Sequence, residues 1–156
     1  MARKDASGLL PSLFLLLFCC SCGSSAKLNR AKAPDEIRET VFRYQFAQFK
    51  HTGEQVYFIQ ISGQDPSDEF MQRFKEAKPV VKKNSQSNPG ARITDQQTGF
   101  RGVACDVGEI KWTGARSVEV PASYSLGNKG QVQYTFTLKW EKEKWKVTGK
   151  KFLKAS

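Results

Sequence analysis

From Arg101 onward, apolar and polar residues alternate, and this period of two constrains the fold more than any other feature of the chain. A period of two places every second side chain on one face of a strand, so each alternating run predicts a half-buried strand. The apolar members of the runs are Val103, Cys105, Val107, Ile110 and Trp112, then Val118, Val120, Ala122, Tyr124 and Leu126, then Val132, Tyr134, Phe136, Leu138 and Trp140, and finally Trp145, Val147 and Phe152. The connections are short, including a hairpin loop at residues 141–144, and they predict an antiparallel meander.

Two positions within these runs predict irregularities. The alternation changes phase at Gly108, which predicts a β-bulge. Pro121 lacks the N–H group that a strand donates to its neighbour, so its strand is expected to be bulged or to lie at an edge of the sheet.

The preceding part of the chain reads as helix, strand and helix. Pro34 followed by two acids predicts a helix start, and Gly53 predicts its end, close to His51. Residues 55–62 are rich in β-branched and aromatic side chains and predict a strand that is apolar on both faces for part of its length. A second helix is expected from Asp65, with that residue as the cap and Pro66 in the first turn.

Pro79 is expected to end the second helix, and residues 78–97 read as a loop rich in Lys, Asn, Ser, Gln, Pro and Gly. Twenty residues without regular structure exceed the usual length of a loop in a compact domain. This segment is therefore expected to be functional, to be mobile, or to hide a short strand.

Helices followed by a run of strands predict an α+β fold in which N-terminal helices pack on one face of a curved antiparallel sheet. The chain resembles the cone-like folds of the nuclear transport factor 2-like and cystatin-like superfamilies, and also a group of uncharacterised secreted or lipoprotein-like bacterial proteins. The segments that carry the resemblance are residues 41–46 (VFRYQF), 56–58 (VYF), 65–70 (DPSDEF), 79–83 (PVVKK), 110–112 (IKW) and 145–147 (WKV). The resemblance implies a fold and brings no activity with it.

The first 22 residues are typical of a signal peptide. Arg3 and Lys4 precede an apolar stretch of about ten residues, which is within the length of a signal-peptide core and too short to span a bilayer as a helix. Cys22 lies between small residues, as in the lipid-attachment motif of bacterial lipoproteins, so the alternatives are lipidation at Cys22 or ordinary cleavage near Ser25 or Ala26. The expected organisation is a leader over 1–22, a flexible linker over 23–33 and one domain over 34–156, exported to the cell envelope with a lipid anchor or secreted.

Few chemistries that need sulfur or imidazole fit the mature domain. Cys105 is its only cysteine and His51 the only histidine of the chain, which leaves no pairs for disulfides, zinc clusters or a nucleophile with a histidine base. Cys105 lies between valines and is expected to be a buried core thiol. We expect neither a metal nor a cofactor.

The candidate site residues are two acids and four aromatic residues. Asp106 and Glu119 lie on predicted strands among apolar neighbours, and one carboxylate in an aromatic pocket could act as a general base in a small isomerase or hydrolase. Tyr57, Trp112, Tyr124 and Tyr134 would line any cleft beneath the first helix as ligand-binding residues, and their alternative role is ordinary core packing.

Charge gives the best indication of a partner. The formal net charge is +10, and residues 139–154 contain seven Lys and two Glu. Such a surplus draws a protein toward anionic surfaces, although a merely solvated basic surface has the same composition. Nucleic acid is the weaker expectation, because Trp140 shares the parity of the apolar core positions and is not a free stacking platform. The favoured interpretation is a noncatalytic binding or assembly module whose partner is an anionic envelope surface or another protein, with membrane contact only through a lipid anchor.

Overall fold

A computed structural model of the protein describes residues 28–49, 55–128 and 130–156, which form a mixed α+β fold with one large sheet. The leader, Cys22, the cleavage positions Ser25 and Ala26, and His51 lie outside the described residues, and the predictions made for them remain predictions.

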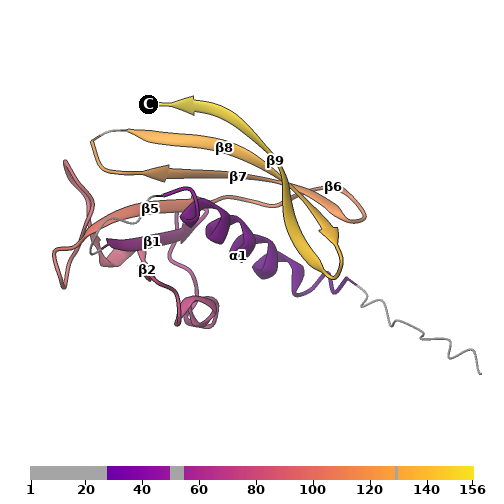
Figure 1. Ribbon diagram of the computed structural model, residues 1–156, viewed down its shortest axis with the longest axis horizontal. Coiled ribbons are helices and arrows are strands. Elements are labelled where there is room, and N and C mark those ends of the chain that lie inside the picture. Colours follow the sequence, from indigo (N-terminus) through magenta and orange to yellow (C-terminus); the bar gives the residue numbers. More distant parts are fainter. Residues whose placement is uncertain (1–27, 50–54, 129) are drawn as a thin grey trace, which may run out of the picture.

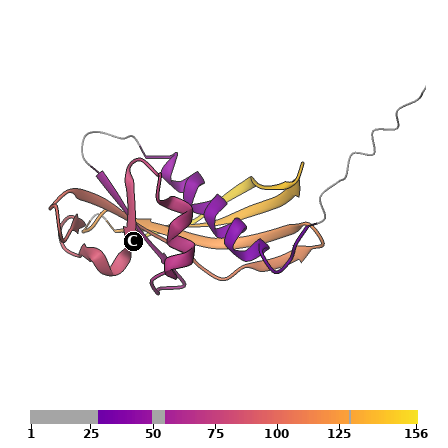
Figure 2. The ribbon, with the colours of Figure 1, turned by 90° about the horizontal axis from the view of Figure 1, so that it is seen from below.

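The elements follow one another as two helical parts and a series of strands. Their bounds are α1 (Ala33–Phe46), β1 (Gln55–Ile61), α2 (Asp68–Met71), the 3-10 turn η1 (Gln72–Phe74), β2 (Val80–Lys83), the 3-10 turn η2 (Asn84–Gln86), β3 (Ser87–Asn88), β4 (Thr94–Asp95), β5 (Arg101–Val107), β6 (Lys111–Gly114), β7 (Ser117–Ser125), β8 (Gln131–Glu141) and β9 (Lys144–Ala155). The main strands lie in the order β2-β1-β5-β7-β8-β9, while β3 and β4 extend from β5 and β6 pairs with β7. Figure 1 shows α1 lying across one face of this curved sheet, and Figure 2 shows the same packing from below.

The sheet is mixed, so the prediction of an antiparallel sheet is right for its C-terminal half and wrong for its N-terminal half. Strands β7, β8 and β9 form the predicted antiparallel meander, and β5 pairs antiparallel with β7. Strand β1, however, runs parallel to both β2 and β5. The reason is that long connections, one of which contains α2, carry the chain back across the sheet before each parallel partner begins.

The segment 78–97 holds short strands, which is one of the alternatives that its length suggested. Val80–Lys83 forms β2 and pairs with residues 56–59 of β1, and β3 and β4 pair with each other further along. The side chain of Lys82 forms an ion pair with Asp95, which is 1% exposed. An edge strand with two lysines gives little apolar periodicity, which explains why sequence pattern alone reads it as a loop.

The helix boundaries differ from the predicted ones for identifiable reasons. Helix α1 ends at Phe46, so the prediction of an end near Gly53 is wrong, and the Phe46 carbonyl accepts from the Tyr57 hydroxyl at 3.2 Å and the Phe49 N–H at 3.1 Å. Helix α2 is capped by Ser67, whose hydroxyl accepts the Phe70 N–H at 3.2 Å. The prediction of Asp65 as the cap is wrong, because its carboxylate instead accepts hydrogen bonds from Ser85.

Alternating side chains give the sheet two different faces, which we call the helix face and the outer face. The helix face packs against α1, α2 and η1 to form the main core. The largest fully buried side chains of this core are Tyr57, Phe42, Phe136, Ile37, Ile59 and Leu138. A second small cluster of Val56, Phe58 and Ile93 covers part of the outer face. The remainder of the outer face, over β7 to β9, carries polar and basic residues.

Pro121 occupies the middle of β7, which has β8 on one side and β5 and β6 on the other, so the prediction of an edge strand is wrong. The Pro121 carbonyl accepts the Gly108 N–H at 2.8 Å, at the point where β5 has ended and β6 has not begun. In a strand the N–H and C=O groups of one residue point the same way, so the N–H that proline lacks would face this interruption and costs the sheet no ladder bond. The apolar–polar alternation therefore changes phase at Gly108 because β5 ends there and β6 begins further on, and not because of a bulge within one strand.

Candidate functional site

A row of polar side chains crosses the outer face of the sheet. The strand registers place Gln60 of β1 beside Asp106 of β5, Asp106 beside Ser123 of β7, and Ser123 beside Gln133 of β8. These positions alternate with buried residues of the helix face, so their side chains emerge together on the opposite side. We call these four residues the polar row.

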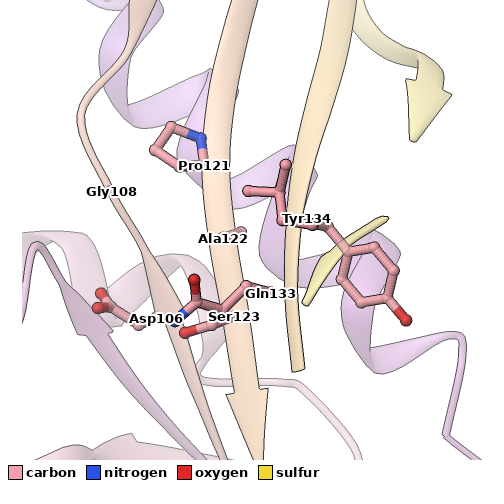
Figure 3. Close-up of a pocket in the computed structure, with 8 residues that line it drawn as sticks. Asp106, Gly108, Pro121, Ala122, Ser123, Gln133 and Tyr134 are labelled. Carbon is pink, nitrogen blue, oxygen red and sulfur yellow. The ribbon is translucent and has the colours of Figure 1, made fainter. Parts of the chain in front are cut away.

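A depression of about 120 Å³ opens along the polar row. Asp106, Ser123 and Gln133 provide its polar lining, and Pro121 and Leu153 provide apolar walls. In Figure 3 the Gln133 amide reaches over β7 to lie beside Ser123, toward Asp106 on the neighbouring strand. The site is thus a small, open hollow with one carboxylate at one end.

Asp106 is the half-buried acid of this depression. Burial raises the pKa of its carboxyl group above the ordinary value, and hydrogen bonds from Gln60 and from the backbone N–H groups of Gly63, Val107 and Ser62 only partly offset that rise. The Gly63 N–H lies 3.4 Å from Asp106 Oδ1, which is a long and weak bond. Within residues 28–49, 55–128 and 130–156, no lysine or arginine forms an ion pair with this carboxylate.

Neighbouring amides hold the polar row in one orientation. Asn84 Nδ2 donates to Gln60 Oε1 at 2.9 Å, which leaves the Gln60 amide nitrogen to donate toward Asp106. At the other end, Gln131 Nε2 donates to Ser123 Oγ at 2.8 Å, and Gln133 Nε2 donates to Gln131 Oε1 at 3.0 Å. The second chain of bonds uses one of the two N–H donors of Gln133 and leaves its Oε1 as an acceptor.

Glu119 does not belong to this depression. It lies on the outer face of β7 opposite Lys111 of β6 and Thr137 of β8, whereas Asp106 lies opposite Ser123 further along β7. The structure therefore does not bring Asp106 and Glu119 together as a pair of catalytic carboxylates.

The four aromatic candidates all lie on the helix face, but they are not equivalent. Tyr57 is 1% exposed and its ring stacks on Phe46 with centroids 4.2 Å apart; burial, with a smaller contribution from Cys105, raises its pKa to about 12. Trp112 contacts Trp145 edge to face at 5.7 Å. These contacts are those of core residues.

Tyr124 and Tyr134 line a void of only about 10 Å³ at the C-terminal end of α1. This is about the smallest volume that holds one water molecule. Phe49 fills the space beside Tyr124, with ring centroids 4.9 Å apart, and Lys150 lies 4.0 Å from the centre of the Tyr134 ring. The part of the cleft that these tyrosines would line is thus occupied by protein side chains.

Lysines dominate the outer side of β9. The positions of β9 that pair with outward residues of β8 are Lys144, Lys146, Gly149, Lys151 and Lys154. In this hairpin, Lys146 lies 3.8 Å from Glu141, while Lys151 and Lys154 form no ion pair with the described residues. Phe152 and Leu153, between these lysines, are 57% and 47% exposed. We call the strands β8 and β9 with these lysines the basic hairpin.

The remaining chemistry of the described residues is limited. Cys105 is 1% exposed, and burial, together with the nearby Asp106, raises the pKa of its thiol, so it is the core thiol that the alternation predicts. Among the described residues, no three His, Cys, Asp or Glu side chains form a group that could hold a metal ion. Their helices also include none that is long and apolar enough to cross a membrane.

Sequence pattern identified Asp106 but missed its companions. Gln60, Ser123 and Gln133 are ordinary polar residues at outward positions, and they are distant from one another in the sequence. Only the register between strands places them side by side, and this register depends on tertiary packing. The polar parity of their strands is the one signal that could have indicated a shared face.

Comparison with known proteins adds no relative. No protein-family model, no curated protein and no solved structure matches the chain. Its function therefore has to be inferred from its own residues and their arrangement.

Proposed function

We propose that the protein is a noncatalytic binding module, exported to the cell envelope or secreted, that attaches to an anionic surface through the basic hairpin. The observation that carries the proposal is the lysine row along the outer side of β9. Successive outward residues of a strand lie roughly 6–7 Å apart, so Lys144 with Lys146 and Lys151 with Lys154 place positive charge along one side of β9, with Gly149 between the two pairs. A line of charge is complementary to a polymer or headgroup layer with repeated negative groups.

The rest of the molecule is consistent with an electrostatic role. The formal net charge of the chain is +10, which increases the local concentration of the protein near anionic surfaces. Leu153 is exposed beside Lys154, whereas Phe152 pairs with Tyr134 and contacts its ring on the helix face. Lys151 and Lys154 are not neutralised by acids of the described residues, so their charge is available to a partner.

Export is the part of the proposal that rests on the sequence of residues 1–22. The basic start, the short apolar stretch and the small residues after it support a signal peptide, with lipidation at Cys22 or cleavage shortly afterward as the alternatives. Intact-mass measurement of protein from envelope fractions tests this part directly. Native protein in the cytosol that retains residues 1–21 would contradict it.

We also propose that the fold is the cone-like one of the nuclear transport factor 2-like or cystatin-like superfamilies. The support is the sheet curving around α1, as seen in Figure 1. An experimental structure that shows a flat sheet, or α1 on the other face, would contradict this assignment.

Cosedimentation tests the binding function. The protein is spun with anionic vesicles, neutral vesicles and anionic cell-wall polymer at increasing salt, with a sample without vesicles or polymer to correct for aggregation. We expect sedimentation with the anionic samples that falls as salt rises, because salt screens exposed charges. Retention that does not depend on salt would contradict the proposal.

A matched pair of variants locates the binding face. Lys151→Gln with Lys154→Gln removes two positive charges from the basic hairpin, and Lys32→Gln with Lys75→Gln removes two exposed charges elsewhere. We expect the first pair to weaken sedimentation and the second to leave it nearly unchanged. Equal losses would mean that net charge alone, and not the hairpin, determines the binding.

Asp106 supports a second candidate function, that of a small pocket-based isomerase or hydrolase. A half-buried carboxylate with a raised pKa can serve as a general base. Turnover of p-nitrophenyl acetate that depends on Asp106 and is lost in Asp106→Asn would favour this function over the noncatalytic one. Turnover that is the same in both proteins would exclude a catalytic role for Asp106 in ester hydrolysis.

A further inference from the structure

We infer that the depression around Asp106 is a binding site for the primary ammonium group of a small ligand. This inference concerns a separate site and a cationic ligand, and it goes beyond the proposed attachment of the basic hairpin to an anionic partner. It follows from the carboxylate of Asp106, which forms no ion pair with the described residues, and from the acceptor groups that lie beside it.

The lining of the depression offers more acceptors than donors. Gln133 Nε2 donates one of its two N–H groups to Gln131 Oε1, at 3.0 Å, and Gln133 Oε1 remains as an acceptor. Ser123 Oγ accepts one bond from Gln131 and keeps a second lone pair. With the Asp106 carboxylate, these groups provide three acceptors, which matches the three N–H donors of a primary ammonium group.

The charge of the lining also favours a cation. Asp106 is partly withdrawn from water and has no ion-pair partner among the described residues. The Gly63 N–H donates to it at the long distance of 3.4 Å, and the backbone N–H groups of Ser62 and Val107 also donate to it. A bound ammonium would supply a positively charged donor, which this carboxylate lacks among the described residues.

The size and the walls restrict the ligand. The hollow, of about 120 Å³, suits a head group of a few non-hydrogen atoms, and the rest of a ligand would extend from its open side. Pro121 and Leu153 form apolar walls suited to the carbon atoms next to the nitrogen. Ethylammonium therefore represents the ligand well as a probe, because it carries three N–H donors and a short apolar tail.

Titration of the full chain with ethylammonium chloride, followed by NMR at constant ionic strength, tests the inference. We expect saturable shifts of the Gln133 side-chain amide and of the Ser123 backbone amide. Tetramethylammonium carries the same charge without N–H donors, and it should produce much smaller shifts. The absence of saturable shifts with ethylammonium, or equal responses to the two cations, would overturn the inference.

Two variants identify the carboxylate responsible. Asp106→Asn should weaken ethylammonium binding by about tenfold or more, because it removes the charge-assisted bonds. Glu119→Gln removes an acid from the same face outside the depression and should leave the affinity unchanged. Equal affinities of Asp106→Asn and the unmodified protein would refute the site, provided the amide spectrum shows that the variant is folded.

The amine site and the basic hairpin can fail independently. Asp106→Asn should still sediment with anionic vesicles, and the variant with Lys151→Gln and Lys154→Gln should still bind ethylammonium. Loss of vesicle binding alone therefore counts against the proposed function, and loss of amine binding alone counts against this site.

Discussion

Lys82 Nζ lies 2.9 Å and 2.8 Å from the two carboxylate oxygens of Asp95, and this pair fastens β4 to the edge strand β2. Asp95 is 1% exposed and also accepts the N–H and hydroxyl of Thr98 at 3.0 Å and 2.7 Å. The pair holds the segment that carries Ile93 against the outer side of β1 and β5. It is therefore the polar anchor of the second, smaller core.

Replacing Asp95 by Ala should reduce the free energy of unfolding by about 3 kcal/mol, because the change leaves Lys82 without its partner in a largely buried setting. Urea denaturation measures the loss. Asp68→Ala is the matched control, since Asp68 also pairs with a lysine, Lys83 at 2.6 Å, but its side chain is 91% exposed. We expect the control to change stability little. Similar losses in both variants would show that burial of the Asp95 pair is not what stabilises it.

The same anchor should make stability depend on pH at the acid end. Burial acts against the Asp95 carboxylate, but hydrogen bonds from Lys82 and Thr98 outweigh this effect and lower its pKa. A carboxyl group with a lowered pKa in the folded state stabilises the fold above its unfolded pKa of about 3.9, and this contribution is lost as pH falls below that value. Unfolding free energies measured from pH 6 to pH 2 should therefore fall more steeply in the unmodified protein than in Asp95→Asn. Parallel curves would contradict the assignment.

The ionised carboxylate of Asp106 should lower the stability of the fold at neutral pH, whereas that of Asp95 raises it. Burial raises the pKa of this carboxyl group, so its ionised form costs the folded state free energy at neutral pH. Asp106→Asn should therefore be more stable than the unmodified protein at pH 7, and the gain should disappear below about pH 4, where the acid is protonated in both states. Thermal unfolding at the two pH values measures the difference. A variant that is less stable at pH 7 would mean that hydrogen bonds to the carboxylate outweigh its burial.

Gly102 should be intolerant of any side chain because Phe58 occupies the space above it. A Cβ atom there would lie 2.3 Å from Phe58 Cε2 and 3.0 Å from the Val56 carbonyl oxygen. Gly102→Ala should therefore cost about 1–3 kcal/mol of unfolding free energy, the usual penalty for overpacking. Gly90→Ala is the control, since its nearest neighbour would be 3.7 Å away, and it should stay within about 0.5 kcal/mol of the unmodified protein.

A double-mutant cycle links this cost to the ring. Phe58→Leu makes room above Gly102, so adding Gly102→Ala to Phe58→Leu should cost less than adding it to the unmodified protein. Additive effects would show that the backbone, and not Phe58, excludes the methyl group.

The features that sequence could predict are those set by local pattern. Phe136 and Leu138 are buried with the parity that their alternation predicts, and the hairpin loop contains Lys142 and Glu143 with φ of 49° and 62°, as a tight two-residue turn requires. The parallel pairing of β1 with β2 and β5 has no local signal, because parallel strands are joined by contacts far apart in the chain. The polar row could not be predicted for the same reason, although its charged member, Asp106, was recognised as a candidate.

The aromatic residues illustrate a second limit. Parity places Tyr57, Tyr124 and Tyr134 on the helix face, where the structure has them. It cannot show how much space α1 leaves above the sheet, and Phe46 and Phe49 take up the space beside Tyr57 and Tyr124. Whether a face holds a cavity or a core depends on the volumes of side chains from both layers.

Strand β9 is the last strand of the sheet, and in the part of the chain described here its outward backbone edge pairs with no other strand. An unpaired edge can form strand pairs with the same edge of another copy of the chain. Burial of the exposed Phe152 and Leu153 in such an assembly would favour this aggregation. Lys150, Lys151 and Lys154 place like charges where two copies would meet and so act as gatekeepers against fibril growth. The lysines proposed to recognise an anionic partner therefore also oppose self-association of the protein at this edge. A second copy is repelled, whereas a partner of opposite charge is attracted.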